Sequence, residues 1–118
     1  MGLQNRELLS SGEKFSCCVC FALIHYFHKD GRSLRKVAEG GNYSISTLSL
    51  ALSGLREIKV STLQEISESL GVTSLEVVAY AQKIFDDQTE FSRLQVLREK
   101  MLSLKVLTEK TKRDIAGT

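Results

Sequence analysis

The apolar positions of this chain recur at helical spacing, and no segment alternates polar and apolar residues as a strand would. Between Glu13 and Lys29 the apolar residues occupy most of the helix circumference, which predicts a buried first helix. Shorter helical patterns follow Ser33 and Ser44, and the side chain of either serine suits the N-cap of the next helix. The pattern therefore predicts an all-α protein.

Further helices are predicted by local start signals. Thr62 and Glu65 have the spacing of a capping box, which predicts a helix from Thr62 to Leu70. The same spacing recurs between positions 73 and 76 and predicts another helix that ends near position 85. The chain contains no proline, so nothing in it forbids long helices on steric grounds.

The last predicted helix runs from position 88 to about 113, with Asp87 as its cap. Its apolar positions are spaced 3, 4 and 3 residues apart, as in the seam of a coiled coil: Leu94, Leu97, Met101 and Leu104. Such a stripe also suits a core helix of a monomer. Because the preceding helices are sufficient to close a core of their own, we expect the stripe to bind a second copy. The predicted organisation is an arm over 1–12, a domain over 13–86 and a dimerisation helix over 87–118.

Charge is distributed unevenly along the chain, although its net value is only +2. Residues 29–60 carry six basic and three acidic side chains, residues 61–90 carry one and six, and residues 91–118 carry seven and three. Two basic segments around an acidic one permit a local nucleic-acid face. On charge alone, solvated helix faces explain these blocks better.

Chemistry-bearing residues give no sign of a metal site or of catalysis. Cys17, Cys20, His25 and His28 are ligand types, but all four fall on one predicted helix, and a zinc finger separates its two pairs by about 12 residues. No phosphate loop, paired carboxylates or oriented Cys/His pair is present. We therefore expect no cofactor and no enzymatic activity.

The cellular compartment follows from the cysteines and from the lack of a long apolar run. Three cysteines within four residues cannot form the disulfide framework of a small secreted domain. The first 14 residues are polar, and the apolar run over 15–27 is too short to span a membrane. These features predict a cytoplasmic protein that has no membrane segment.

Between positions 33 and 78, short sequence pieces occur in a characteristic order without a gap. They are Val37-Ala38-Glu39, Asn42-Tyr43-Ser44, Ser46-Thr47-Leu48-Ser49, Gly54, Ser61-Thr62-Leu63-Gln64-Glu65-Ile66 and Leu70-Gly71-Val72. In this order they resemble the helix-turn-helix of the lambda-repressor and Cro family, the Xre-type domain. The resemblance implies a lambda-repressor-like five-helix DNA-binding domain, here followed by the long C-terminal helix.

The resemblance also implies roles for individual positions. The second helix of the motif would lie in the major groove of double-stranded DNA, held against the first helix by Tyr43, Leu48 and Ala51. Two sets of contacts carry over by position: base readout by Ile45, Ser46, Ser49 and Leu50, and contacts to the DNA backbone by Ser44, Ser53, Arg56 and Lys59.

Two departures from the family pattern change the expectation. The recognition helix contains no Arg, Lys, Asn, Gln or His, the side chains that make bidentate base contacts. Ser reads bases weakly, and Ile45 is suited only to a thymine methyl, so readout is expected to be modest or to depend on DNA shape. In addition, Gly41 stands where a core leucine is common in the family.

The sequence as a whole predicts a transcriptional regulator of phage-repressor type that binds a two-fold operator as a homodimer. One alternative is the antitoxin of a toxin–antitoxin operon, which would use the same domain and also bind a toxin protein. The other is a degenerate helix-turn-helix that serves only as a protein-interaction module.

Overall fold

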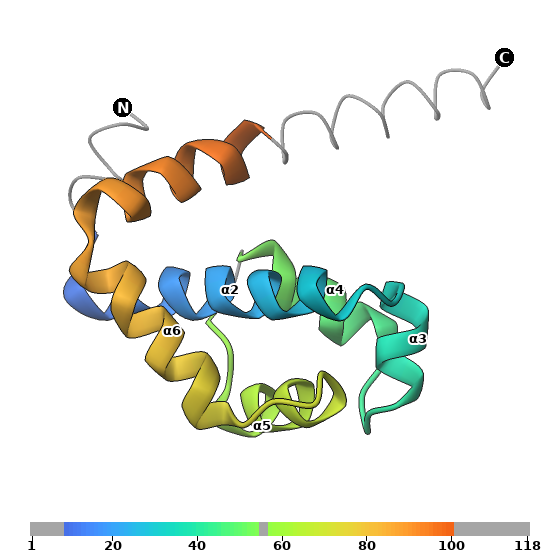
Figure 1. Ribbon diagram of the computed structural model, residues 1–118. Coiled ribbons are helices and arrows are strands. Elements are labelled where there is room, and N and C mark those ends of the chain that lie inside the picture. Colours follow the sequence, from blue (N-terminus) through green and yellow to red (C-terminus); the bar gives the residue numbers. More distant parts are fainter. Residues whose placement is uncertain (1–8, 55–56, 101–118) are drawn as a thin grey trace, which may run out of the picture. The chain divides into compact units, whose positions relative to one another are not determined.

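The computed structural model describes residues 9–54 and 57–100, and the chain divides into two compact units, residues 1–86 and 87–118. Within the described ranges the regular structure is entirely helical, which confirms the predicted all-α fold. The described residues of the first unit form five helices (Figure 1): α2 (Ser11–Asp30), α3 (Leu34–Glu39), α4 (Ile45–Ser53), α5 (Val60–Ser69) and α6 (Ser74–Asp86). In the second unit, residues 88–100 are helical.

Local caps set most helix starts. The Ser33 hydroxyl accepts a hydrogen bond from the Lys36 amide, and the Ser44 hydroxyl accepts one from the Thr47 amide, as predicted. The predicted box at the start of α6 also forms, because Thr73 and Glu76 bond each other's backbone amides at 3.0 Å.

The first helix begins earlier than predicted. Ser10 and Glu13 form a capping box, with both hydrogen bonds at 3.1 Å. Glu13 is therefore the third residue of the first turn rather than the start of the helix. Ser11 and Gly12, which the sequence placed in the arm, belong to α2.

The capping box predicted at Thr62 is wrong. Helix α5 starts at Val60, with Lys59 as an N-cap that makes no side-chain cap bond. The Leu63 amide already bonds the Lys59 carbonyl at 2.9 Å, so Thr62 lies inside the first turn and has no cap to make.

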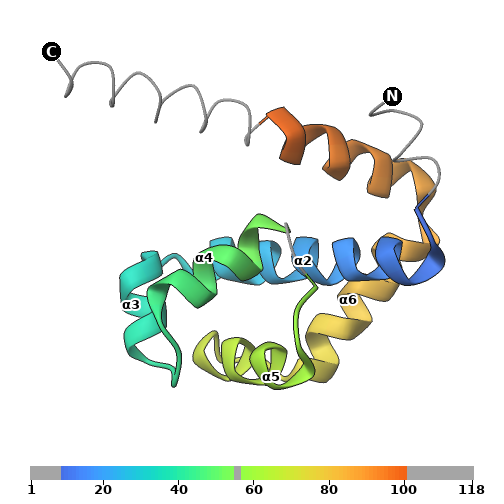
Figure 2. The same cartoon turned by 180° about the vertical axis from the view of Figure 1, so that it is seen from behind.

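The five helices of the first unit pack in a closed ring in the order α2, α4, α3, α5, α6 and back to α2. Figure 2 shows α3 and α4 near one end of α2 and α6 near the other. Each helix contributes one fully buried large apolar side chain to the centre: Leu23, Val37, Leu48, Ile66 and Val77. The ring therefore closes around a shared core.

The cysteines of α2 take part in this packing. Cys18 and Cys20 are buried, and all three cysteines are in the reduced thiol form. Burial raises the pKa of the Cys18 thiol to about 11. His25 is exposed and stacks on Tyr80 of α6, with 4.2 Å between the ring centres.

None of the helices over the described residues is long and apolar enough to cross a membrane. No group of three or more His, Cys, Asp or Glu side chains in this part of the chain is placed to hold a metal ion.

Candidate nucleic-acid interface

Helices α3 and α4 form a short helix, a turn and a second helix. Helix α3 ends at Glu39 with Gly40 as its C-cap, and residues 41–43 form the turn before the Ser44 cap. Helix α4 ends at Ser53, and its C-cap Gly54 has a left-handed φ of 72°, which favours glycine. The start and the end of α4 therefore each have a local cause.

One side of α4 is seated in the core. Leu48 is fully buried and Ala51 is 7% exposed. The Cys20 thiol of α2 donates a hydrogen bond to the Leu52 carbonyl at 3.3 Å, which satisfies an acceptor in the last turn of α4. These contacts fix the side of α4 that faces outward.

The outward side of α4 carries the four residues predicted to read bases. Ile45 and Leu50 are 40% and 45% exposed, Ser46 is exposed, and Ser49 is half-buried. The hydroxyls of Ser46 and Ser49 make no side-chain hydrogen bond to the described residues. The structure thus brings two apolar side chains and two hydroxyls onto one face, without any charged group from α4.

The residues predicted to contact the DNA backbone differ in whether their polar groups are exposed or already hydrogen-bonded. The Ser44 hydroxyl caps α4, and the Ser53 hydroxyl donates to the Leu50 carbonyl at 2.7 Å, so both are already engaged within the helix. Lys59 is exposed just before α5. Arg56 lies outside the described residues. Sequence reasoning did not single out Arg35 and Lys36, which are exposed on α3.

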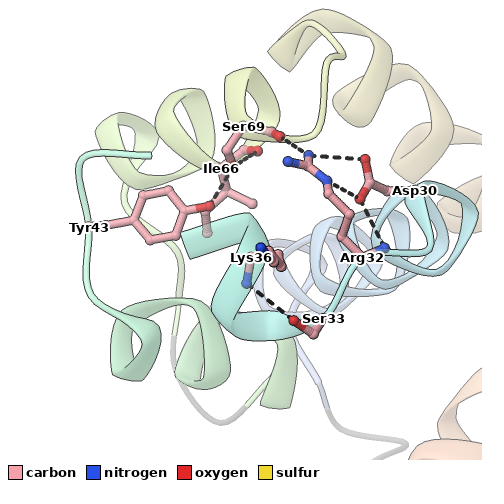
Figure 3. A network of polar contacts seen from close by, with 7 residues as sticks. All are labelled: Asp30, Arg32, Ser33, Lys36, Tyr43, Ile66 and Ser69. Atoms are coloured by element: carbon pink, nitrogen blue, oxygen red, sulfur yellow. Dashed lines mark hydrogen bonds and ion pairs between the residues drawn. The ribbon is translucent and has the colours of Figure 1, made fainter. Parts of the chain in front are cut away.

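A polar network ties this motif to α5 (Figure 3). The Arg32 guanidinium pairs with Asp30 at 2.7 Å and donates to the Ser69 carbonyl at 2.6 Å. Its hydrogen bonds hold the pKa of the Asp30 carboxyl below its usual range. The Tyr43 hydroxyl, in the turn before α4, bonds the Ser69 hydroxyl. Ser69 thus joins the turn and the end of α2 to the end of α5.

Tyr43 makes a contact that the sequence did not predict. The sequence assigned it to holding the second helix of the motif against the first, and its hydroxyl also bonds Ser69 at the end of α5. Its ring lies against Gly41, where a Cβ atom would stand only 2.2 Å from the ring carbon Cε1. The ring therefore occupies the space that a side chain at position 41 would need.

The predicted dimerisation stripe lies in the second unit. Leu94 and Leu97 lie on the helix over residues 88–100. Leu97 is 43% exposed, and its neighbour Val96 is 42% exposed. Met101 and Leu104 lie outside the described residues.

Comparison with known proteins gave one finding. Residues 29–77 match a protein-family model for the helix-turn-helix, a range that includes α3, the turn, α4 and α5. Searches of curated proteins and of solved structures gave no match.

Proposed function

Because residues 29–77 form a helix-turn-helix of the Xre and lambda-repressor type, a DNA-binding module, we propose that the protein is a transcriptional regulator that binds a two-fold operator as a homodimer. The observation that carries the proposal is the seating of α4. Its Leu48 side is buried, and its Ile45 and Leu50 side is open to solvent. A helix held in this way is available to the major groove, whose width of about 12 Å admits one helix.

Within this proposal, Ile45, Ser46, Ser49 and Leu50 face base edges. Phosphate contacts come mainly from Arg56 and Lys59, since the hydroxyls of Ser44 and Ser53 are engaged in α4. Phosphate contacts fix the position of a protein on the duplex, and base contacts supply its specificity. An interface with few base-reading groups therefore depends strongly on its phosphate contacts.

The homodimer part of the proposal rests on Leu94, Leu97, Met101 and Leu104. Leu97 is 43% exposed in the described part of the helix, and an apolar stripe of this spacing suits a partner helix. Two linked domains bind one operator at a high effective concentration, which offsets weak readout by each half-site. In the related role of antitoxin, the same dimer would also bind a toxin protein.

A second candidate function has support from the composition of α4. Its outward face has no charged or amide side chain, and its two exposed apolar residues suit a protein surface as well. In that case the helix-turn-helix would be an interaction module that does not bind DNA.

Selection of bound duplexes from a random DNA pool, followed by gel shift on the selected site, separates these functions. A regulator enriches a two-fold sequence, whereas an interaction module enriches none. The key variant is Ser46→Glu, because Ser46 is exposed and free of side-chain hydrogen bonds, and a carboxylate there would face the phosphates. It should abolish binding while the circular dichroism spectrum is kept.

The matched control is Ala79→Glu, which adds the same charge at an exposed position of α6. It should bind almost as well as the unmodified protein. Equal binding by a folded Ser46→Glu protein would remove α4 from the interface.

A further inference from the structure

The exposed face of α4 has an unusual chemical character for a surface that reads DNA. At about 100° per residue, Ile45, Ser46, Ser49 and Leu50 span an arc of about 140° on the helix. Leu48 and Ala51 lie outside this arc and are buried. The orientation of α4 is therefore set by its core residues, which leave the arc at the surface, with Ser49 half-buried.

The groups on this face limit which base edges it is able to recognise. Bidentate contacts to guanine need Arg or Lys, those to adenine need Asn or Gln, and acceptance from cytosine needs Asp or Glu. None of these residues occurs in α4. The two largest exposed groups are the hydrocarbon side chains of Ile45 and Leu50, which offer only apolar contact.

The major groove contains one apolar group that differs between the four bases, the C5 methyl of thymine. We propose that Ile45 and Leu50 read thymine methyls, so that each half-site carries thymine where these side chains meet the groove. This inference rests on the proposed function and names the feature of DNA that the site selects. Ser46 and Ser49 lie between the two apolar side chains, and their hydroxyls bond nearby base edges in a sequence-tolerant manner.

The spacing of the two side chains fits two separate bases. Five residues correspond to a rise of about 7.5 Å along the helix axis. Neighbouring base pairs are about 3.4 Å apart along the duplex. Ile45 and Leu50 stand at the two edges of the arc. When α4 lies along the groove, they therefore reach methyls about two base-pair steps apart, each toward a different wall of the groove.

Replacing each thymine of the selected site by deoxyuridine, one position at a time, tests the proposal. This change removes only the methyl and keeps the hydrogen-bonding edge. At the thymines that face Ile45 and Leu50, affinity should fall about fourfold per methyl, as expected for burial of one methyl-sized group. At the other thymines affinity should hardly change.

A cycle with protein variants assigns each methyl to its reader. In Ile45→Ala, uracil should cost nothing further at the base that Ile45 faces and should keep its cost at the base that Leu50 faces. Leu50→Ala should give the reverse. The control is Gln82→Ala, an exposed position of α6, which should leave both uracil effects unchanged.

The outcomes separate this inference from the proposed function. If the protein binds a selected site and uracil has no effect at any thymine, methyl reading is wrong and DNA binding stands. The same holds if uracil effects persist unchanged in both α4 variants. If the folded protein binds no duplex, the methyl proposal and the proposed function both fail, and the apolar face of α4 belongs to a protein contact.

Discussion

Substitution of Gly41 by alanine should destabilise the first unit through the ring of Tyr43. An added Cβ atom would lie 2.2 Å from Cε1, 2.8 Å from Cδ1 and 2.9 Å from Cζ of that ring. The ring must therefore move, and its hydroxyl would lose the hydrogen bond to Ser69. Gly41 is not among the glycines with positive φ, so its backbone suits alanine and the side-chain clash is the only cause.

The magnitude follows from three contributions. The lost hydrogen bond costs about 0.5–1.5 kcal/mol. Crowding by the new methyl costs about 1–3 kcal/mol. Alanine also restricts the unfolded chain, which raises the free energy of unfolding by about 0.4–1 kcal/mol and offsets part of this loss. The net loss should be roughly 2 kcal/mol, which for a domain of this size lowers Tm by about 10 °C.

Thermal and urea unfolding, followed by circular dichroism, measure this loss. The decisive comparison is Gly41→Ala in a Tyr43→Ala background, where all three crowding atoms are gone. There the alanine should be neutral or slightly stabilising, so the two changes should show a coupling of about 2 kcal/mol. Gly12→Ala is the control, because its Cβ would have room, with Ser10 Oγ the nearest atom at 4.0 Å. An equal cost of Gly41→Ala in both backgrounds would refute the argument that the ring causes it.

Three further predictions concern DNA binding, assembly and pH. Lys59→Ala should weaken binding to operator and random DNA alike and lower the slope of log affinity against log salt by about 1 per protomer. Lys83→Ala on α6 is the control. An unchanged slope in Lys59→Ala would remove Lys59 from the interface. Leu97→Asp should convert a dimer to a folded monomer in sedimentation experiments, since loss of a leucine that the dimer interface would bury costs about 2–5 kcal/mol. Ser92→Asp, at an exposed position on the opposite side of that helix, should stay dimeric, and a monomeric unmodified protein would exclude the dimer. The pKa of Cys18 is raised from 9.0 to about 11, so the stability that its neutral thiol contributes is complete below pH 9 and is lost as the pH rises toward 11. Cys18→Ala should flatten that alkaline decline in urea unfolding, and identical declines in both proteins would count against the burial of this thiol.

Features that depend on residues three or four apart were predictable from the sequence. The Ser33 and Ser44 caps, the Thr73 capping box and the glycine end of α4 all formed as predicted. Caps depend on local backbone geometry, so the sequence carries their signal directly. The order of helices between positions 33 and 78 was equally evident, and the family match over 29–77 agrees with it.

Where two local signals competed, the sequence was insufficient. Thr62 had the spacing of a cap, but the helix starts at Val60, which has no capping side chain before it. A bond of the Leu63 amide to the Lys59 carbonyl begins the helical ladder one turn before the Thr62 signal would. Leu63 is buried in the core, so packing of this turn favours the earlier start.

The contacts that join the helix-turn-helix to the other helices were decided by tertiary structure. Tyr43 meets Ser69 across 26 positions, Arg32 reaches the same residue across 37, and Cys20 meets the Leu52 carbonyl across 32. Such pairs leave no periodic trace in a single sequence, since each partner alone looks like an ordinary polar or small residue. The sequence was sufficient to predict which helix would carry the proposed recognition face and which residue types lie on that helix. Only packing of the helices around a shared core determined which side of α4 turns outward and placed the Tyr43 ring against Gly41.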